Sequence, residues 1–377
     1  MILISGIITA LYCALILLLR YGWEKLPPGI AQNTEEKVKF SILVPFRNEA
    51  ENLPFLLKSI SELKYPRDHF EVILIDDDSE DSSVEVLKEF RDFHPTFPLK
   101  ILNNERHSGS PKKDAITMGV KNANFAYIFT TDADCILPQS LLEQYSIEIQ
   151  RNGYSLMAGP VAFGNSYKIN PLLKNFQDLD FISLQATGAA AFGLKKPFLC
   201  NGANLCYKKS DFLEVNGFAG NNNISSGDDV FLLQKFVEHQ KNVRYLKHRE
   251  AIVITNYQSS IRGLFQQRIR WAAKTTEYSG VFSKITGILV LLMNFLLVSG
   301  VILAGFGTLP ASYLLLIFLL KFSADLFLLY PAANFFNKKQ VLRNFWFCSL
   351  LYPFFTTYVA ISSLFTGFEW KGRKYNQ

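Results

Sequence analysis

The sequence predicts an α/β domain, with a mostly parallel sheet flanked by helices, joined to transmembrane α-helices. Through the middle of the chain, short apolar strand patterns alternate with amphipathic helix patterns, which is typical of parallel strands with helical crossovers. Near both ends stand apolar stretches of about 20 residues, long enough to cross a bilayer. The 377-residue chain is 49% hydrophobic and 14% aromatic, a composition that favours a membrane protein over a purely soluble enzyme.

The first apolar stretch runs from Met1 to Leu19 and contains no charged residue. Arg20, Lys25 and a Pro-Pro-Gly linker at Pro27–Gly29 follow it. A secretory signal peptide would have a basic start and a small-residue cleavage site, and this segment has neither. We therefore expect residues 1–22 to be an uncleaved transmembrane anchor.

Three further apolar stretches lie towards the end of the chain. They are Ile285–Leu309, Ala311–Phe336 and Phe345–Phe368. The middle one contains Lys321 and Asp325, which are spaced so that they can pair and lessen the cost of burial in lipid. We expect a surface-lying amphipathic helix within residues 258–283, about three transmembrane helices within residues 284–368, and a basic tail at residues 369–377.

Basic residues near the ends of the spans predict the orientation, because such residues stay on the cytoplasmic side. They follow the first span and recur between the third and fourth, at Lys338, Lys339 and Arg343. This pattern predicts a multi-pass protein of the cell (inner) membrane with residues 38–257 in the cytoplasm. Three C-terminal spans would leave the tail outside, whereas a re-entrant hairpin bent at Pro353 would bring it back, and both alternatives stay open.

The charge balance favours some classes of binding partner over others. The net charge is +6, from 39 Lys and Arg against 33 Asp and Glu. Much of the excess lies near span ends and around Gln266–Lys274, which suits anionic lipid headgroups and phosphates. The chain has no dense basic tract and no zinc or RNA-binding signature, so we expect no nucleic-acid partner. Five scattered cysteines without metal-ligand spacing fit a reducing compartment.

Polar clusters follow the strand patterns of the central region. The expected strands are Phe40–Val44, Glu71–Ile75, Leu99–Leu102 and Phe125–Thr131, and the expected helices include Leu53–Leu63, Ser79–Phe90, Lys113–Lys121 and Pro171–Phe192. Acidic or amide side chains follow three of the strands, at Asn48-Glu49, Asp76-Asp77 and Asp132-Asp134. In a parallel sheet the ligand site lies at the carboxyl ends of the strands, so these clusters map to one rim.

The segment DADCILP places Asp132 and Asp134 one residue apart at the end of an expected strand. Residues i and i+2 of an extended segment point the same way, so both carboxylates can approach one cation. A strand-to-loop turn also favours Asp. These two residues alone therefore leave a metal site and a simple turn both open.

Seven segments, in order, resemble family 2 glycosyltransferases of the GT-A fold, in the membrane-bound branch that contains a Q-x-x-R-W motif. They are ILVPFRNEAENL (Ile42–Leu53), VILIDDDSEDSS (Val72–Ser83), SPKKDAITMG (Ser110–Gly119), TTDADCILP (Thr130–Pro138), NGANLCYKKSDFLEVNGF (Asn201–Phe218), SGDDVFL (Ser226–Leu232) and QQRIRW (Gln266–Trp271). Each match is weak by itself, but together they cover nearly all of residues 38–275. The resemblance implies a nucleotide-sugar donor and a divalent cation, Mg or Mn.

The resemblance also implies roles for individual residues on the donor side. Nucleotide-sugar binding would fall to Pro45, Glu49, Asp76, Asp77, Asp132 and either Lys112 or Lys113. Asp134 would be the main metal ligand, with Asp132 close to the ribose or the metal, and the cation would stabilise the charge that grows on the leaving diphosphate. This chain reads A-I-T-M-G where the family reads A-L-N-x-G, so which lysine takes part stays open.

On the acceptor side, an inverting transfer needs a base to take the proton of the attacking hydroxyl. The family uses the second residue of a Glu-Asp motif, and this chain has Asp228 then Asp229, which assigns Asp229 as the base and Asp228 as its neighbour. The same residues also suit a helix start. Gln267, Arg270 and Trp271 match Q-x-x-R-W, which implies a diphosphate contact for Arg270 and the acceptor entrance for Trp271. A basic helix lying on the membrane would show the same pattern.

The expected function is therefore an inverting, metal-dependent hexosyl transfer from a nucleotide-diphosphate sugar, UDP-linked by the resemblance, to a membrane lipid or lipid-linked acceptor. A processive polysaccharide synthase is an alternative within the same class, although three C-terminal spans leave little material for a polymer channel. A catalytically inactive membrane scaffold of a glycan-assembly complex is a second alternative. Such a scaffold would be expected to have lost Asp134, Asp229 or Arg270, and all three are present.

Overall fold

The computed structural model describes residues 2–29, 36–164, 169–222, 224, 226–274, 280–365, 368–370 and 373–375. The chain divides into two compact units. The sheet unit takes in the described parts of Leu26–Gly164 and Leu199–Asn256, and the helical unit takes in those of Met1–Lys25, Asn165–Phe198 and Tyr257–Gln377. Residues 275–279 of the predicted surface segment, and residues 371–372 and 376–377 of the predicted tail, lie outside the described residues.

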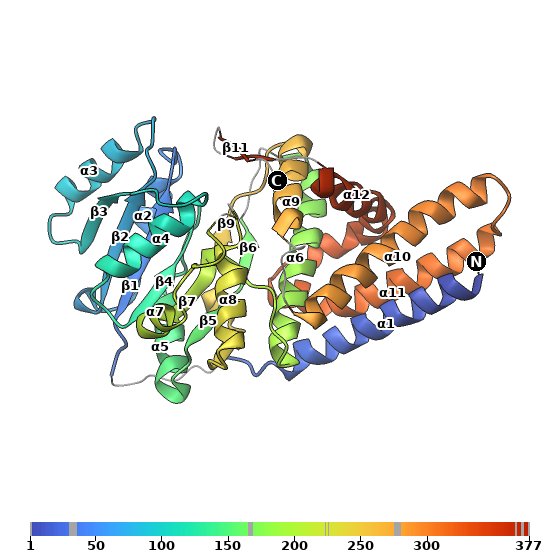
Figure 1. The fold of residues 1–377 in the computed structure, drawn as a ribbon, viewed down its shortest axis with the longest axis horizontal. Coiled ribbons are helices and arrows are strands. Elements are labelled where there is room, and N and C mark those ends of the chain that lie inside the picture. The colour runs from blue at the N-terminus through green and yellow to red at the C-terminus, as the bar shows by residue number, and fades with distance from the viewer. Residues whose placement is uncertain are drawn as a thin grey trace. The chain divides into compact units, whose positions relative to one another are not determined.

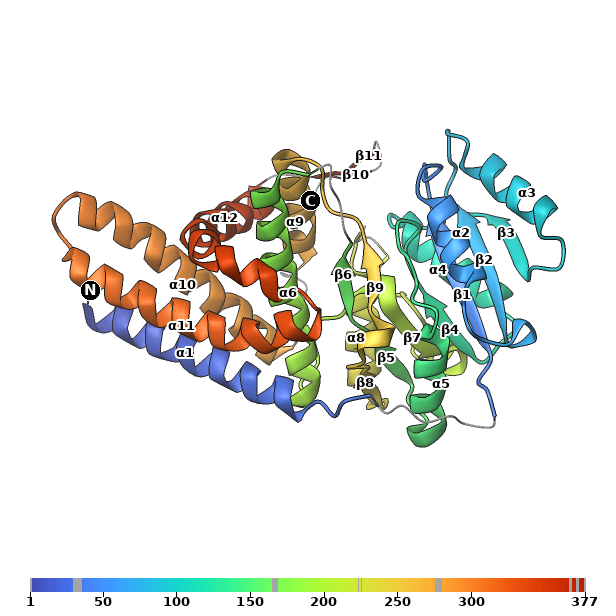
Figure 2. The same ribbon diagram turned by 180° about the vertical axis from the view of Figure 1, so that it is seen from behind.

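The sheet unit is built on a seven-stranded sheet in the order β3-β2-β1-β4-β7-β5-β8 (Figures 1 and 2). Its strands are β1 (Phe40–Phe46), β2 (Phe70–Asp76), β3 (Leu99–Asn103), β4 (Tyr127–Thr130), β5 (Leu156–Ala158), β7 (Leu205–Lys208) and β8 (Val243–Tyr245). Only β7 runs antiparallel to its neighbours β4 and β5. The sheet is thus mostly parallel, as predicted. A separate parallel pair joins β6 (Val161–Phe163) to β9 (Val253–Thr255).

Helices connect these strands. They are α2 (Leu53–Ser61), α3 (Ser83–Phe93), α4 (Pro111–Asn122), α5 (Leu141–Asn152), α7 (Lys209–Glu214) and α8 (Asp228–Glu238), with short 3-10 turns η1 (Arg67–His69), η2 (Gly202–Asn204) and η3 (Arg249–Ala251). Helix α3 begins at Ser83, later than the predicted Ser79, and the N–H of Ser79 is instead bound by the Asp76 carboxylate. The Asp81 carboxylate then accepts the N–H of Ser83 and so starts the helix.

The core of the sheet unit lies along β1 and β2, whose apolar side chains are fully buried. Burial on both faces is expected for central parallel strands. Helix α4 packs on these two strands. Its Gly119 allows a close approach, since an added Cβ would lie 2.9 Å from Cδ1 of Leu43. This packing fixes the first turn of α4 at the rim where β1 and β2 end.

The helical unit contains six helices among the described residues. They are α1 (Ile2–Lys25), α6 (Pro171–Gly193), α9 (Ile261–Ala273), α10 (Val281–Gly305), α11 (Ala311–Phe335) and α12 (Phe345–Phe365), with the 3-10 turn η5 (Lys339–Asn344) and the strand pair β10 (Phe368–Trp370) and β11 (Arg373–Tyr375). Four described segments are long and apolar enough to cross a membrane: α1, α10, α11 and Lys339–Phe365. Helix α12 continues through Pro353, so the hairpin bent at that residue does not form.

Helices α1, α10 and α11 run side by side in both views (Figures 1 and 2). Lys321 and Asp325 form the predicted pair at 2.5 Å, and the Tyr12 hydroxyl of α1 donates to the same carboxylate at 2.6 Å. Near its end, α1 crosses α6 so closely that a Cβ on Gly193 would lie 1.9 Å from the carbonyl oxygen of Gly22. The first helix is therefore an integral part of this unit.

Candidate active site

A partly buried lysine and two carboxylates meet at the rim of the sheet unit. Nζ of Lys112, in the first turn of α4, donates to Oδ1 of Asp132 at 2.7 Å and lies 3.2 Å from Oδ2 of Asp228. Asp132 follows β4, and Asp228 is the first residue of α8. Burial by itself would lower the pKa of Lys112, but Asp132 and Asp228 outweigh it and hold that pKa well above its usual value. The ammonium group therefore stays charged.

Asp229 lies next to this cluster and is held by backbone N–H groups. Its Oδ2 accepts the N–H of Gly202 at 3.2 Å, and its Oδ1 accepts the N–H of Val230 at 2.7 Å. Gly202 leaves room for the Asp228 carboxylate, because an added Cβ would lie 2.9 Å from its Oδ2 and that side chain would have to shift. Gly227 leads into α8 with a left-handed φ of 83°. The acids thus begin a helix, where negative charge is favoured.

Asp134 lies on the turn after β4 and has a different neighbour from Asp132. Its Oδ2 accepts the hydroxyl of Thr255, at the end of β9, at 3.2 Å. Among the residues that the structure describes, no group of three or more His, Cys, Asp or Glu could hold a metal ion. Mg or Mn is often bound through one or two carboxylates, with phosphates and waters completing its shell. The oxygen donors of Asp132 and Asp134 fit a cation bound together with a diphosphate.

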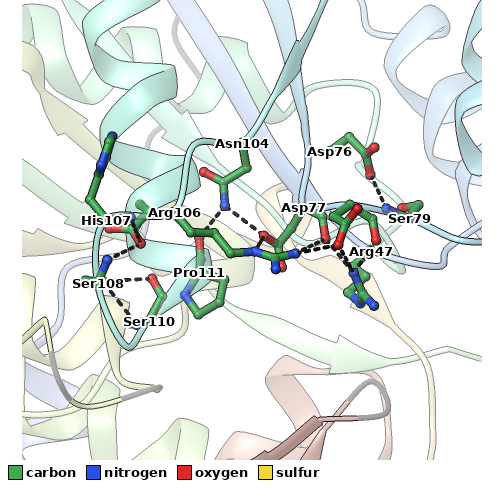
Figure 3. A network of polar contacts seen from close by, with 12 residues as sticks. Arg47, Asp76, Asp77, Ser79, Asn104, Arg106, His107, Ser108, Ser110 and Pro111 are labelled. Carbon is green, nitrogen blue, oxygen red and sulfur yellow. Dashed lines mark hydrogen bonds and ion pairs between the residues drawn. The ribbon is translucent and has the colours of Figure 1, made fainter.

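The two acids at the end of β2, Asp76 and Asp77, have different partners (Figure 3). Oδ1 of Asp77 accepts from Nε of Arg106 at 2.7 Å and from Nδ2 of Asn104 at 2.9 Å. Oδ1 of Asp76 accepts the N–H of Ser79 at 3.0 Å. The Asp77 carboxylate therefore holds the loop after β3 in place. Arg106 belongs to none of the motifs in the sequence, so this partner of Asp77 was not predicted.

The turn after β1 is fixed by Arg47, which is buried. Its Nη1 donates to the carbonyl oxygen of Asp77 at 2.8 Å, and its Nη2 donates to Glu80 at 2.7 Å. Pro45 lies within β1, opposite Ile75 of β2. Glu49 follows on the same turn and accepts from Nδ2 of Asn52 at 2.6 Å. Pro45 and Glu49 thus belong to the rim formed by β1 and β2, as the strand pattern predicts.

The two adjacent lysines of α4 point to different surroundings. Lys113 is only 1% exposed, and its Nζ donates to the carbonyl oxygens of Asn221 at 2.7 Å and Ile224 at 2.8 Å. It also lies 4.8 Å from the centre of the Phe231 ring. Lys113 therefore holds the segment that precedes α8. Of the two lysines, Lys112 is the one among the carboxylates.

The Q-x-x-R-W residues lie on α9 of the helical unit, where the residue after Gln267 organises them. Arg268 is 4% exposed, and its Nε donates to Oδ2 of Asp180 on α6 at 2.5 Å. Its Nη1 donates to the side-chain oxygen of Gln267, and its guanidinium lies 4.2 Å from the Trp271 ring centre. Arg270 is half-buried on the same helix. Sequence reasoning did not single out Arg268 or Asp180; the signal was the pair of acids, Asp178 and Asp180, within the predicted helix Pro171–Phe192.

Family models decide the class of this protein. The model described as "Glycosyl transferase family group 2" matches residues 127–361, more than half of the chain, and the one described as "Glycosyl transferase family 2" matches residues 41–211. The chain belongs to glycosyltransferase family 2. The matched ranges contain the carboxylates and lysine of the cluster described above, and the first also contains α9.

Curated relatives of this family 2 glycosyltransferase include two that differ in coverage. Glycosyltransferase AglE of Haloferax volcanii is 30% identical over 123 residues, which is 33% of this chain and 39% of that protein. A poly-β-1,6-N-acetyl-D-glucosamine synthase of Staphylococcus epidermidis is 27% identical over 235 residues, 62% of this chain and 53% of that protein. The chain thus spans between about two fifths and about half of these relatives' lengths.

A solved structure confirms the fold of this family 2 glycosyltransferase. The mannosyltransferase PcManGT from Pyrobaculum calidifontis, in complex with GDP-Man and Mn2+, superposes with a TM-score of 0.59 at 16% identity. The match covers 97% of this chain and 99% of that one. At this identity the likeness establishes the predicted GT-A fold and says nothing of the substrate.

Proposed function

We propose that this protein is an inverting, metal-dependent glycosyltransferase that moves a sugar from a UDP-linked donor to a membrane lipid or lipid-linked acceptor at the cytoplasmic face. The observation that carries the proposal is the cluster of Asp132, Asp228 and Asp229 around and beside the Lys112 ammonium. These groups come from three separate elements and meet at the carboxyl ends of parallel strands, where ligands bind in such sheets.

The diphosphate of the donor would bind to Lys112 and replace Asp132 as its hydrogen-bond partner. A diphosphate brings several anionic oxygens, and Lys112 can donate to them in place of Asp132. Asp132 and Asp134 would then be the ligands of Mg or Mn. The cation, when bound, stabilises the negative charge that grows on the leaving diphosphate. Asp76, with Pro45 and Glu49 on the neighbouring turn, would bind the nucleoside.

Asp229 would act on the acceptor. It takes the proton of the acceptor hydroxyl while that oxygen attacks the anomeric carbon and the bond to the diphosphate breaks on the opposite face. The N–H groups of Gly202 and Val230 fix the orientation of its carboxylate. Asp228 would stay beside Lys112 as its counter-charge. An acceptor that is already an ionised phosphate would need no base, so dependence on Asp229 distinguishes hydroxyl from phosphate acceptors.

The membrane acceptor is supported by the helical unit. It contains four described segments that are long and apolar enough to cross a bilayer. It also contains α9, on which the buried Arg268–Asp180 pair fixes Gln267 and Trp271. In the proposed enzyme Arg270 contacts the diphosphate and Trp271 lies at the entrance for the acceptor.

A second candidate is a processive polysaccharide synthase. The relatives that favour it are the poly-β-1,6-N-acetyl-D-glucosamine synthases, of which one is 27% identical over 235 residues. The two candidates differ in product. A lipid glycosyltransferase adds one sugar to each acceptor, whereas a synthase produces a polymer from the same donor.

The test uses the full chain in detergent with a panel of UDP- and GDP-sugars, Mn or Mg, and total membrane lipid. Nucleoside diphosphate release and product size are measured for the wild type, Asp229→Asn and Asp134→Ala. Asp92→Asn, an exposed acid on α3, is the matched control. We expect one lipid product and a loss of about a hundredfold or more for Asp229→Asn. A polymer would favour the synthase, and no release from any donor by the folded protein would favour the scaffold.

A further inference from the structure

We propose that α12 does not cross the membrane but lies along one face of it, with its apolar side in a single leaflet. Its length and composition would allow it to span, so the decisive point is where its two ends lie. The end of the helical unit where α1 finishes at Lys25 is here called the Lys25 end. The second half of α12 packs on α9 there, and its first residue lies beside Phe322, near the middle of α11, so neither end of α12 reaches the opposite end of the unit. The sheet unit follows directly at Leu26, so the residues after α12 share a side of the membrane with it.

The start of α12 is fixed by the pairing of α1 with α11. At the Lys25 end, the rings of Trp23 and Phe335 are 5.6 Å apart, edge to face. At the opposite end, the hydroxyls of Ser5 and Tyr313 are 2.9 Å apart. Helices α1 and α11 thus run antiparallel, and α11 finishes at the Lys25 end. Only the short turn η5 separates it from α12.

The position of α9 is fixed by α10. Helix α10 begins beside the end of α6, where the rings of Phe282 and Phe198 are 5.8 Å apart. That end of α6 is the one whose Gly193 contacts Gly22. Helix α10 therefore starts at the Lys25 end, and α9, which precedes it by a short connection, lies there too. Both α6 and α9 run across the direction of α1, α10 and α11 (Figures 1 and 2).

The second half of α12 packs on α9. Leu264 of α9 forms a buried cluster with Phe355 and Val359. The ring of Phe265 lies 4.9 Å from that of Phe355 and 5.0 Å from that of Tyr358. The backbone of β10, which follows α12, also lies against α9. A spanning helix of 21 residues would carry its last residue about 31 Å away, to the opposite end of the unit.

The direction of α12 agrees with this placement. Figures 1 and 2 show α12 nearly end-on, whereas α1, α10 and α11 run across the view. Its first residue, Phe345, lies 4.7 Å from the ring of Phe322, within α11. The Tyr352 ring lies 5.6 Å from Nζ of Lys321, also within α11. Helix α12 therefore passes across α11 instead of running along it.

One side of α12 is left uncovered and is apolar along the whole helix. The uncovered residues recur every three or four positions: Trp346, Leu350, Phe354, Tyr358, Ile361 and Phe365. Acyl chains of one leaflet are the occupant that this stripe fits, since a continuous apolar stripe is unfavourable in water. The exposed Lys339 and Arg343 come just before α12, where they suit anionic headgroups. In this arrangement three described helices cross the bilayer: α1, α10 and α11.

Cysteine labelling in intact cells tests the topology without any need for activity. In a variant with its five cysteines replaced by alanine, single cysteines are introduced as Gln377→Cys, Lys88→Cys in the sheet unit, and Thr308→Cys in the loop between α10 and α11. A maleimide that cannot cross membranes is applied before and after permeabilisation. We expect Gln377→Cys to behave like Lys88→Cys and opposite to Thr308→Cys. Behaviour like Thr308→Cys would overturn the proposal.

Fluorescence quenching tests the lipid contact independently. In a variant whose four tryptophans are replaced by phenylalanine, Phe354→Trp places one fluorophore at the middle of the stripe. The protein is reconstituted with lipids brominated either near the headgroup or near the bilayer centre. We expect stronger quenching by the shallow bromines. Stronger quenching by the deep bromines would indicate a spanning helix, and no quenching by either would show that a protein surface covers the stripe; both results contradict the proposal.

Discussion

Replacing Lys112 with methionine should tighten metal binding to the nucleotide-free protein and weaken sugar transfer. The ammonium of Lys112 lies 2.7 Å from Oδ1 of Asp132 and 3.2 Å from Oδ2 of Asp228. A cation that binds Asp132 in the absence of donor must compete with this built-in charge. With a diphosphate present, Lys112 has other oxygens to bind, so the competition disappears. Methionine keeps the apolar stem of the side chain and removes only the charge.

The size of the effect follows from the geometry. Two unit charges about 4 Å apart interact by about 4 kcal/mol at an effective dielectric constant of about 20. The Lys112 side chain is 21% exposed, so solvent screening leaves only a part of this energy, on the order of 1.4 to 2.8 kcal/mol. That range corresponds to Mn2+ binding that is about tenfold to a hundredfold tighter. Without metal, the same variant should unfold at a lower temperature, because its carboxylates then lack a counter-charge.

The assay is calorimetric titration of Mn2+ into the detergent-solubilised full chain, with and without nucleoside diphosphate. Lys121→Met, which removes an exposed lysine from the same helix, is the matched control. In the wild type, nucleoside diphosphate should strengthen Mn2+ binding much more than it does in Lys112→Met. Equal Mn2+ affinity of the folded wild type and Lys112→Met without nucleotide would refute the reasoning.

Three further predictions concern the stability of the fold away from the candidate active site. Asp180→Asn leaves the buried Arg268 guanidinium without its counter-charge, so thermal unfolding should show a loss of about 3 kcal/mol. Gly193→Val should destabilise the protein by about 1 to 3 kcal/mol at the α1–α6 contact, because its Cβ would lie 1.9 Å from the α1 backbone. Gly287→Val is the control: nothing lies within 4 Å of its added Cβ, so its melting temperature should change little. Burial lowers the pKa of His248 in the folded protein, so protonation of this residue favours the unfolded state. The contribution of His248 to stability should be full above about pH 6.5 and should fall as the pH drops below that value. In His248→Gln the melting temperature should therefore depend less on pH over this range.

The predicted strands are determined by their own residues, whereas the missed strands depend on pairing with a neighbouring strand. β1 and β2 are seven-residue runs whose apolar side chains identify them without any partner. β5, β6, β8 and β9 have three residues each. So short a segment carries no pattern that separates it from a loop, and it becomes a strand only when a neighbouring strand pairs with it. No property of the local sequence could have indicated their order in the sheet.

In the candidate site, the sequence predicted which segments lie at the rim of the sheet better than what each side chain contacts. Lys112 and Lys113 are adjacent, and one step along a helix turns a side chain by about 100°. One lysine therefore reaches the carboxylates and the other is buried against backbone carbonyls. Likewise Asp76 and Asp77 are equivalent in the sequence, yet the Asp77 carboxylate is taken by Arg106. Such differences depend on loops that are distant in sequence, and a motif does not encode them.

Two glycines explain why the segments NGA and SGDD belong to one site although they are far apart in the chain. Gly202 brings its backbone N–H to Asp229 and leaves room for the Asp228 carboxylate. Gly227 adopts the left-handed backbone from which α8 can start at Asp228, a conformation that costs other residues free energy. These backbone geometries hold Asp228 and Asp229 beside Lys112. The glycines are therefore as much a part of the site as the acids.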